Sequence, residues 1–176
     1  MKISQQLFKD IFEGPVHSRL VYSRVIVQKI GPRLHENGQF HQMFRNLQHV
    51  AGDLNNHMGG MGLGSLCSHC ASQPTGGCCS LFMSGETDAV QMALNSLAGV
   101  DVHLVCDKGQ ECVFLSDTGC IFLFKPMFCL NYNCKHIHEK KQAKDVQQME
   151  QLTGRLLSLQ YELEKYVLEL LVTQDG

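Results

Sequence analysis

Cysteines carry the clearest chemical signal in this sequence. Nine of the 176 residues are cysteine, and they all fall between positions 67 and 134. Such a number in a chain that shows no export signal indicates metal binding or redox chemistry rather than disulfides. Thiolates are soft ligands that favour zinc or iron–sulfur clusters over magnesium or calcium. The candidate ligand set consists of eight of them: Cys67, Cys70, Cys78, Cys79, Cys112, Cys120, Cys129 and Cys134.

The spacing of these cysteines leaves two arrangements open. Cys67 and Cys70 form a CxxC pair, with which a tight turn can present two thiolates to one metal ion. A Cys78-Cys79 doublet follows, and neighbours in an extended chain point to opposite sides, so the two thiols can serve different sites. Eight thiolates suffice for two four-ligand sites, or for one iron–sulfur cluster such as [4Fe–4S] with the remaining cysteines structural.

The cysteine pattern resembles that of the bacterial CxxCxxCC family, also called YkgJ-type, which is described as a zinc- or iron-chelating domain. The matching stretches are CSHC and GGCC, then CVFLSDTGC, Lys125-Pro126 and FCLNYNC, and the resemblance covers about 67–138. It implies that the eight cysteines bind metal. Two features depart from the family pattern. Seven residues, ASQPTGG, separate the CxxC from the doublet where the family has two or three, and Lys125 replaces an arginine, whose planar donor fork lysine lacks.

The main hypothesis is therefore a non-catalytic metal-binding protein that holds zinc or an iron–sulfur cluster. Some relatives of the family, such as the flagellin lysine methylase, resemble iron–sulfur enzymes, so the alternative is a cluster-dependent redox or modifying enzyme. Glu86, Asp88 and Asp107 are its candidate acids, although carboxylates at such positions usually cap helices or form turns. No catalytic triad, Walker loop or HExxH motif is visible. An oxidised disulfide scaffold is a third alternative.

Several further residues near the cysteines have a plausible but secondary role. His69, His136 and His138 lie close to Cys70 or Cys134 in sequence and are potential nitrogen ligands, but eight thiols already suffice. The ninth cysteine, Cys106, matches no family position, and we interpret it as a free buried thiol, with a spare metal ligand as the alternative. The phenylalanines at 114, 122, 124 and 128 are expected to shield the thiols from water.

Composition restricts the class of protein and its partners. Hydrophobic residues make up 44% and charged residues 18%, which is typical of a globular chain. A net charge of −2 argues against a general nucleic-acid partner. No apolar run approaches the ~18 residues of a membrane span, so no membrane partner is expected. The polar start, MKISQQLFKDIFEG, lacks the apolar core of a signal peptide and predicts a cytoplasmic location.

Hydrophobic periodicity predicts a mainly α fold, α+β at most, in three segments that are expected to form one compact domain. Residues 1–58 are expected to form a helical pair, with a helix that ends at Gly31-Pro32 and a second one over 36–57. Residues 59–138 form the Cys-rich module, entered through a flexible glycine run (GGMGLG). This module should contain a helix capped by Ser84 or Thr87, followed by short strands in VDVHLVC, ECVFL and CIFLF with a hairpin turn at SDTG.

Residues 139–176 are predicted to form a long C-terminal helix. Its apolar residues step by three and four in a heptad pattern, which indicates one continuous packing seam. Either the N-terminal helices cover this seam, or a homodimer or another protein partner does. Gly154 lowers helix propensity, so we expect a close helix crossing there. The predicted seam is Met149, Leu152, Leu156, Leu159, Leu163, Tyr166 and Leu170.

Overall fold

The computed structural model describes residues 4–74, 77–105 and 109–174. It confirms a mainly α fold with a long C-terminal helix and short strands in the Cys-rich region. None of the helices in these ranges combines the length and apolar character that a membrane span requires. The elements are α1 Gln5–Phe12, α2 Val16–Glu36, α3 Gly38–Gly60, α4 Leu63–Ala71, α5 Leu81–Ser84, α6 Ala89–Leu97, β1 Leu115–Ser116, β2 Gly119–Cys120, α7 Met127–Asn131, α8 Lys135–Lys140 and α9 Ala143–Gln174.

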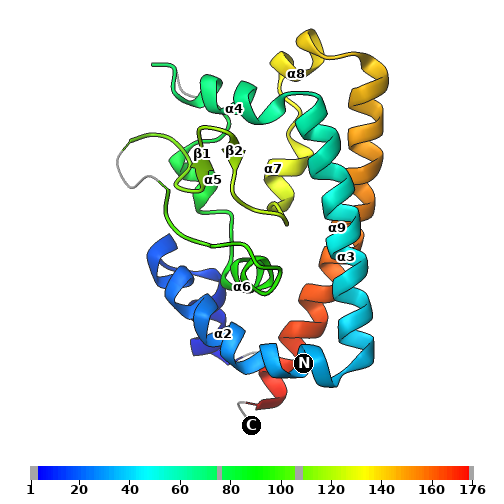
Figure 1. Cartoon of the computed structure of the whole chain (residues 1–176). Helices are drawn as coiled ribbons and strands as arrows, with labels where there is room; N and C mark the ends of the chain where they lie inside the picture. The colour runs from blue at the N-terminus through cyan, green and yellow to red at the C-terminus, as the bar shows by residue number, and fades with distance from the viewer. Residues whose placement is uncertain (1–3, 75–76, 106–108, 175–176) are drawn as a thin grey trace.

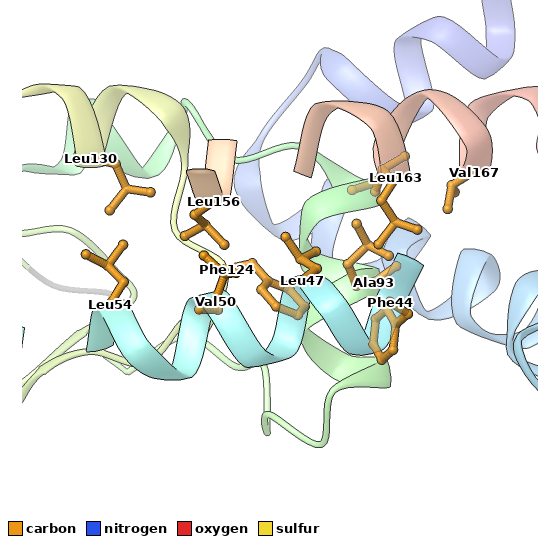
Figure 2. Packing of buried hydrophobic residues seen from close by; sticks show 14 of the residues in the cluster. Phe44, Leu47, Val50, Leu54, Ala93, Phe124, Leu130, Leu156, Leu163 and Val167 are labelled. Carbon is orange, nitrogen blue, oxygen red and sulfur yellow. The ribbon is translucent and has the colours of Figure 1, made fainter. Parts of the chain in front are cut away.

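The long helices α3 and α9 lie side by side and form the spine of the molecule (Figure 1). The apolar stripe predicted along α3 is buried almost as expected, with Phe40, Leu47 and Leu54 fully enclosed. Figure 2 shows this stripe facing Leu156 and Leu163 of α9 across the core. The seam of α9 is therefore covered within the chain, by α3.

Three of the seven residues predicted for the seam of α9 are buried: Met149, Leu156 and Leu163. The other four, Leu152, Leu159, Tyr166 and Leu170, are only half-buried. The rest of the buried stripe is Val146, Thr153, Gln160, Val167 and Leu171. Both stripes have steps of three and four, and the buried one contains two polar residues, so apolar spacing alone selected the wrong neighbours. Gly154 faces no crossing helix, because a Cβ added there would meet nothing within 4 Å.

Two ends of the spine carry different structures (Figure 1). We call α1, α2 and α6 with the adjoining parts of α3 and α9 the helical end, and α4, α5, the β1–β2 hairpin, α7 and α8 the thiol end. At the helical end, α2 packs along α6. The prediction that α2 stops at Gly31-Pro32 was wrong: the helix continues to Glu36, with Ile30 and Leu34 buried on either side of Pro32. This tertiary packing offsets the hydrogen bond that proline removes.

The short helix α6 in the middle of the chain has its N-cap one residue after Thr87, which was one of the two predicted caps. Its N-cap is Asp88, whose carboxylate accepts a hydrogen bond from Gln91 N at 2.8 Å. Gly99 follows the helix with a φ of 87°, the left-handed conformation that favours glycine at a helix end. The side chain of Asn95 on α6 exchanges two hydrogen bonds with the backbone of Phe124, each 2.9 Å long. This pair fixes the chain just before α7.

The strands are shorter than predicted. The hairpin turn at SDTG is confirmed, with Leu115 paired to Cys120 and Ser116 to Gly119. The expected strand in VDVHLVC does not form over residues 100–105, which the structure shows as irregular chain, and Cys106 lies outside the described residues. The segment is still tied in place, because Val105 N donates to Val113 O at 2.7 Å.

The glycine run that was predicted to be a flexible entry has three distinct structural roles instead. Gly59 and Gly60 complete α3, and Gly62 turns the chain into α4 with a φ of 66°. Gly64 sits within α4 directly against the hairpin, where a Cβ on Gly119 would lie 2.9 Å from the Gly64 Cα. The absence of side chains at both positions lets the hairpin touch α4, which brings two cysteine-bearing elements together.

Candidate metal centre

Five separate parts of the thiol end carry the eight predicted cysteines. Cys67 and Cys70 lie on α4, and the doublet precedes α5. The remaining thiols come from the hairpin region, from α7, and from the N-cap of α8. All eight are half-buried and reduced. The CxxC pair lies one helical turn apart on α4, and not in the tight turn that the sequence suggested, so both thiols reach the same neighbourhood from one face.

Four of these thiols are neighbours. The single S–H of Cys79 is within reach of both Cys67 and Cys78, and Cys78 also interacts with Cys134. The hydrogen bond from Cys79 lowers the pKa of Cys78 to about 6, and it lowers the pKa of Cys67 as well. The pKa of Cys79 is raised, because its one proton is held between the sulfurs of Cys67 and Cys78 and because the thiol is buried. Loss of a proton is therefore favoured at Cys78 and Cys67 rather than at Cys79, and the thiolate is the form that binds metal.

A second group of thiols surrounds a cavity of about 180 Å³, which we call the thiol cavity. Burial raises the pKa of Cys129 to about 12 and also raises the pKa of Cys120. Uncharged thiols are therefore favoured here unless a cation is near. The five cysteines that line the cavity are Cys67, Cys79, Cys112, Cys120 and Cys129.

The eight thiols divide into an outer and an inner set. Burial raises the pKa of Cys70, and the charges of Cys78, Cys134 and Cys67 raise it further, which indicates that these thiols are its neighbours. Cys70 and these three thiols make up the outer set. The inner set is Cys79, Cys112, Cys120 and Cys129. The doublet thus contributes one member to each set, while Cys67 also reaches the inner cavity. In the described residues, no three Cys, His, Asp or Glu side chains converge closely enough to hold a single metal ion.

Among the described residues that line the thiol cavity, Lys125 is the one that carries a charged side chain. It is buried, with only 9% of its surface exposed, and it lines the thiol cavity. Its ammonium donates a hydrogen bond to Asn55 Oδ1 and lies close enough to Cys120 and Cys129 to interact with their charge. Burial lowers the pKa of Lys125, and neighbouring thiolates oppose that effect. A buried ammonium needs a negative partner, and among the described residues that line the cavity the thiols would supply one on losing their protons.

Backbone and side-chain hydrogen bonds fix the elements that carry the thiols. Ser68 on α4 donates to Ser116 O of β1 at 2.7 Å, which joins the CxxC helix to the hairpin. Cys112 N donates to Cys79 O at 2.9 Å. From the spine, Asn55 donates to Leu123 O at 3.0 Å. These contacts hold the cavity wall from three sides, so the cavity does not depend on a single loop.

Sequence reasoning missed the residues that support the thiols. Asn55 lies beside the apolar stripe of α3, and Asn95 lies inside a mostly apolar helix. The signal for these residues in the sequence was a polar amide among apolar neighbours. That signal does not reveal which backbone group the amide binds. Lys125 was noted only as a substitution for arginine. Its position at the cavity depends on the fold of the chain around it.

Other predicted site residues lie away from the thiols. His69 and His138 are exposed and His136 is half-buried, and none of them lines the thiol cavity. Asp88 caps α6. Both Asp88 and Glu86 interact with the charge of Arg19 at the helical end. Asp107 and Cys106 lie outside the described residues. Phe114, Phe122 and Phe124 are buried as expected, but Phe128 is more than half exposed.

No family model matches the chain, and the searches of curated proteins and of solved structures returned no significant match. The resemblance to the CxxCxxCC family therefore stays a prediction.

Proposed function

We propose that this chain is a cysteine-rich metal-binding protein whose thiol end holds an iron–sulfur cluster or zinc. The observation that carries the proposal is the thiol cavity, where five cysteines from distant parts of the chain meet beside the buried ammonium of Lys125. Metal-bound thiolates form a negatively charged group, and the ammonium would offset part of that charge. The same thiols without metal have raised pKa values at Cys120 and Cys129, so a cation would be needed to ionise them.

Of the two metals, an iron–sulfur cluster fits the thiol cavity better. A zinc ion draws its ligands to about 2.3 Å, so a zinc site needs no room beyond the ion itself. A cluster contains inorganic sulfide between its iron atoms and therefore requires space among its ligands. The thiols here lie around a space of about 180 Å³, and no three of them converge on one point in the described residues. This arrangement matches the space that a cluster requires. The inner set would then supply the cluster ligands.

Zinc is the second candidate, and the outer set favours it. Cys67, Cys70, Cys78 and Cys134 lie near one another, but like the inner thiols no three of them converge on one point in the described residues, so they would have to move together to share one ion. The pKa values of Cys67 and Cys78 are lowered, which favours the thiolate form that zinc binds, whereas burial raises that of Cys70. In this role the metal would join α4 to the start of α8 and stabilise the thiol end.

The test is elemental analysis for iron, zinc and acid-labile sulfide on protein purified without oxygen, together with an absorption spectrum. Iron with sulfide and a broad absorption band at about 400 nm supports a cluster, whereas zinc without colour supports a thiolate zinc site. The variants Cys129→Ser and Cys120→Ser test the inner set, Cys70→Ser tests the outer set, and Cys106→Ser is the matched control. Protein that folds but contains neither metal after reconstitution would contradict the proposal, and so would equal metal content in all four variants.

A further inference from the structure

A second cavity lies beside the thiols and has a different character. Its volume is about 310 Å³, within the range of small-molecule sites. We call it the apolar cavity. It shares Cys67, Cys79 and Cys129 with the thiol cavity, so these three sulfurs stand between the two spaces. Cys78 also borders the apolar cavity. A molecule bound there would contact the same sulfurs that are proposed to hold metal.

The chemistry of the walls restricts what the apolar cavity can bind. Three methionines, Met58, Met83 and Met149, line its interior, and methionine adapts to ligands of irregular shape. The polar groups present are neutral ones, such as those of Ser80 and Thr153. Among the described residues that line this cavity, none is an Asp, Glu, Lys, Arg or His, so the walls offer no positive charge. An anionic ligand would leave water without a compensating partner, so the walls favour a neutral molecule over an anion.

Three aromatic side chains at the cavity extend into solvent. Phe82 is 76% exposed, Phe128 54% and Tyr132 60%. They come from α5, from α7 and from the residue after α7, on two sides of the cavity. Aromatic rings that remain this exposed gain contact area when a flat apolar group lies between them. Their position favours a ligand with an aromatic or similarly flat apolar group.

We propose that the apolar cavity is a binding site for a small neutral organic molecule with an aromatic or flat apolar group, placed against Cys67, Cys79 and Cys129. The idea that this molecule is a ligand of the metal centre rests on the proposed function. Binding of the molecule to the cavity does not, because it requires only the cavity. With an iron–sulfur cluster in the inner set, this site would support the alternative of a cluster-dependent enzyme, because it lies where a substrate would reach the metal ligands.

The experiment uses two fluorescent probes of similar shape and different charge. N-phenyl-1-naphthylamine is neutral, and 8-anilino-1-naphthalenesulfonate is anionic. The chain has no tryptophan, so protein emission does not interfere with the probes. Both are titrated into the protein as purified, with its metal content measured in the same sample and its cooperative thermal unfolding checked. We expect saturable binding of one neutral probe per chain, at least about tenfold tighter than the anionic probe.

Matched variants locate the site. The double variant Phe82→Ala, Phe128→Ala should weaken binding of the neutral probe about tenfold, from the loss of two aromatic contacts. Both side chains are exposed, so the fold should be unaffected. Tyr161→Ala removes an exposed aromatic residue of α9 that does not line the cavity, and it should bind as the parent does.

The outcomes separate this inference from the proposed function. Equal binding of the neutral probe by the parent and the double variant would overturn the inference, as would equal affinity for the two probes, whatever the metal content. Conversely, protein without metal that still binds the neutral probe selectively, and loses it in the double variant, would support the site while contradicting the metal-binding proposal.

Discussion

The two ends of the spine are built in different ways. At the helical end, long helices enclose side chains such as Ile26, Ile30 and Phe40 completely. At the thiol end, α5, α7 and α8 have four, five and six residues, and each is too short to be stable alone. Sulfurs there are half-buried, and large apolar side chains such as Phe82 face solvent. Apolar burial accounts for the first end, whereas the second depends on hydrogen bonds between segments and, as we propose, on metal.

The largest expected effect on stability comes from the spine. Leu156→Ala removes a fully buried side chain between α9 and α3 and should lower the free energy of unfolding by about 3 kcal/mol. Chemical denaturation would measure this change. If the two ends are independent, the metal content per folded chain stays the same. A parallel loss of metal would show that the thiol end relies on the packing of the spine.

A pH-dependent effect is expected at the helical end. Burial raises the pKa of Glu164 on α9 to about 7, with a smaller contribution from the charge of Asp88, against an ordinary value of 4.5. The folded state therefore holds a proton that the unfolded state has released. Stability from this group is full below about pH 4.5 and falls as the pH rises to about 7.

Glu164→Gln keeps the shape and removes the charge, so it should stabilise the protein at pH 8 by up to about 3 kcal/mol and have little effect at pH 4.5. Thermal unfolding at the two pH values measures the difference. Glu162→Gln, at another position on α9, is the control and should show no such dependence. Equal changes in melting temperature at both pH values would contradict the assignment.

A smaller effect is expected at the thiol end. Lys125→Met removes the ammonium beside Cys120 and Cys129 and retains similar volume. Without this positive charge the two thiols lose their protons less readily, so the midpoint pH of metal uptake should rise by about one unit. Lys125→Arg keeps the charge and should restore most of the original midpoint. If the midpoint pH of metal uptake is the same in the Met variant and the parent, Lys125 has no influence on metal binding by these thiols.

The smallest expected effect is a gain in stability. Gly154 lies in the interior of α9, and a Cβ there would meet nothing within 4 Å. Gly154→Ala should therefore stabilise the helix by about 1 kcal/mol. Thermal unfolding at pH 4.5, where Glu164 is largely protonated in the folded protein, would measure it. A destabilised variant would reveal a close neighbour at this position, such as a second copy of the chain.

Periodicity predicted most of the helical end. The stripe of α3, from Phe40 to Leu54, follows helical spacing and is buried as predicted, because burial of such a stripe depends on residues close in sequence. Along α9, the buried stripe includes Thr153 and Gln160, which no apolar pattern selects. Local rules also failed at Pro32, where contacts from other helices outweigh the residue's own preference.

The candidate site was predicted in its residue types but not in its arrangement. The cysteine spacing indicated soft-metal ligands, and it left open whether the two cysteines of the doublet serve different sites. It could not reveal which thiols share a cavity, because that depends on contacts such as those of Asn55 and Asn95 with residues about 30 to 70 positions away. The apolar cavity was equally hidden, since its walls come from α3, α5, α7 and α9.

The contact between Gly64 and Gly119 has a consequence for recognising proteins of this type. Each glycine has a fixed offset from a cysteine: Gly64 precedes Cys67 by three residues, and Gly119 directly precedes Cys120. Any larger residue at either position would push the hairpin away from α4 and separate the thiols that these elements carry. A search pattern built on GxxC and GC, with the cysteine intervals between them, would therefore select chains that can close the same cavity, even where the rest of the sequence has diverged.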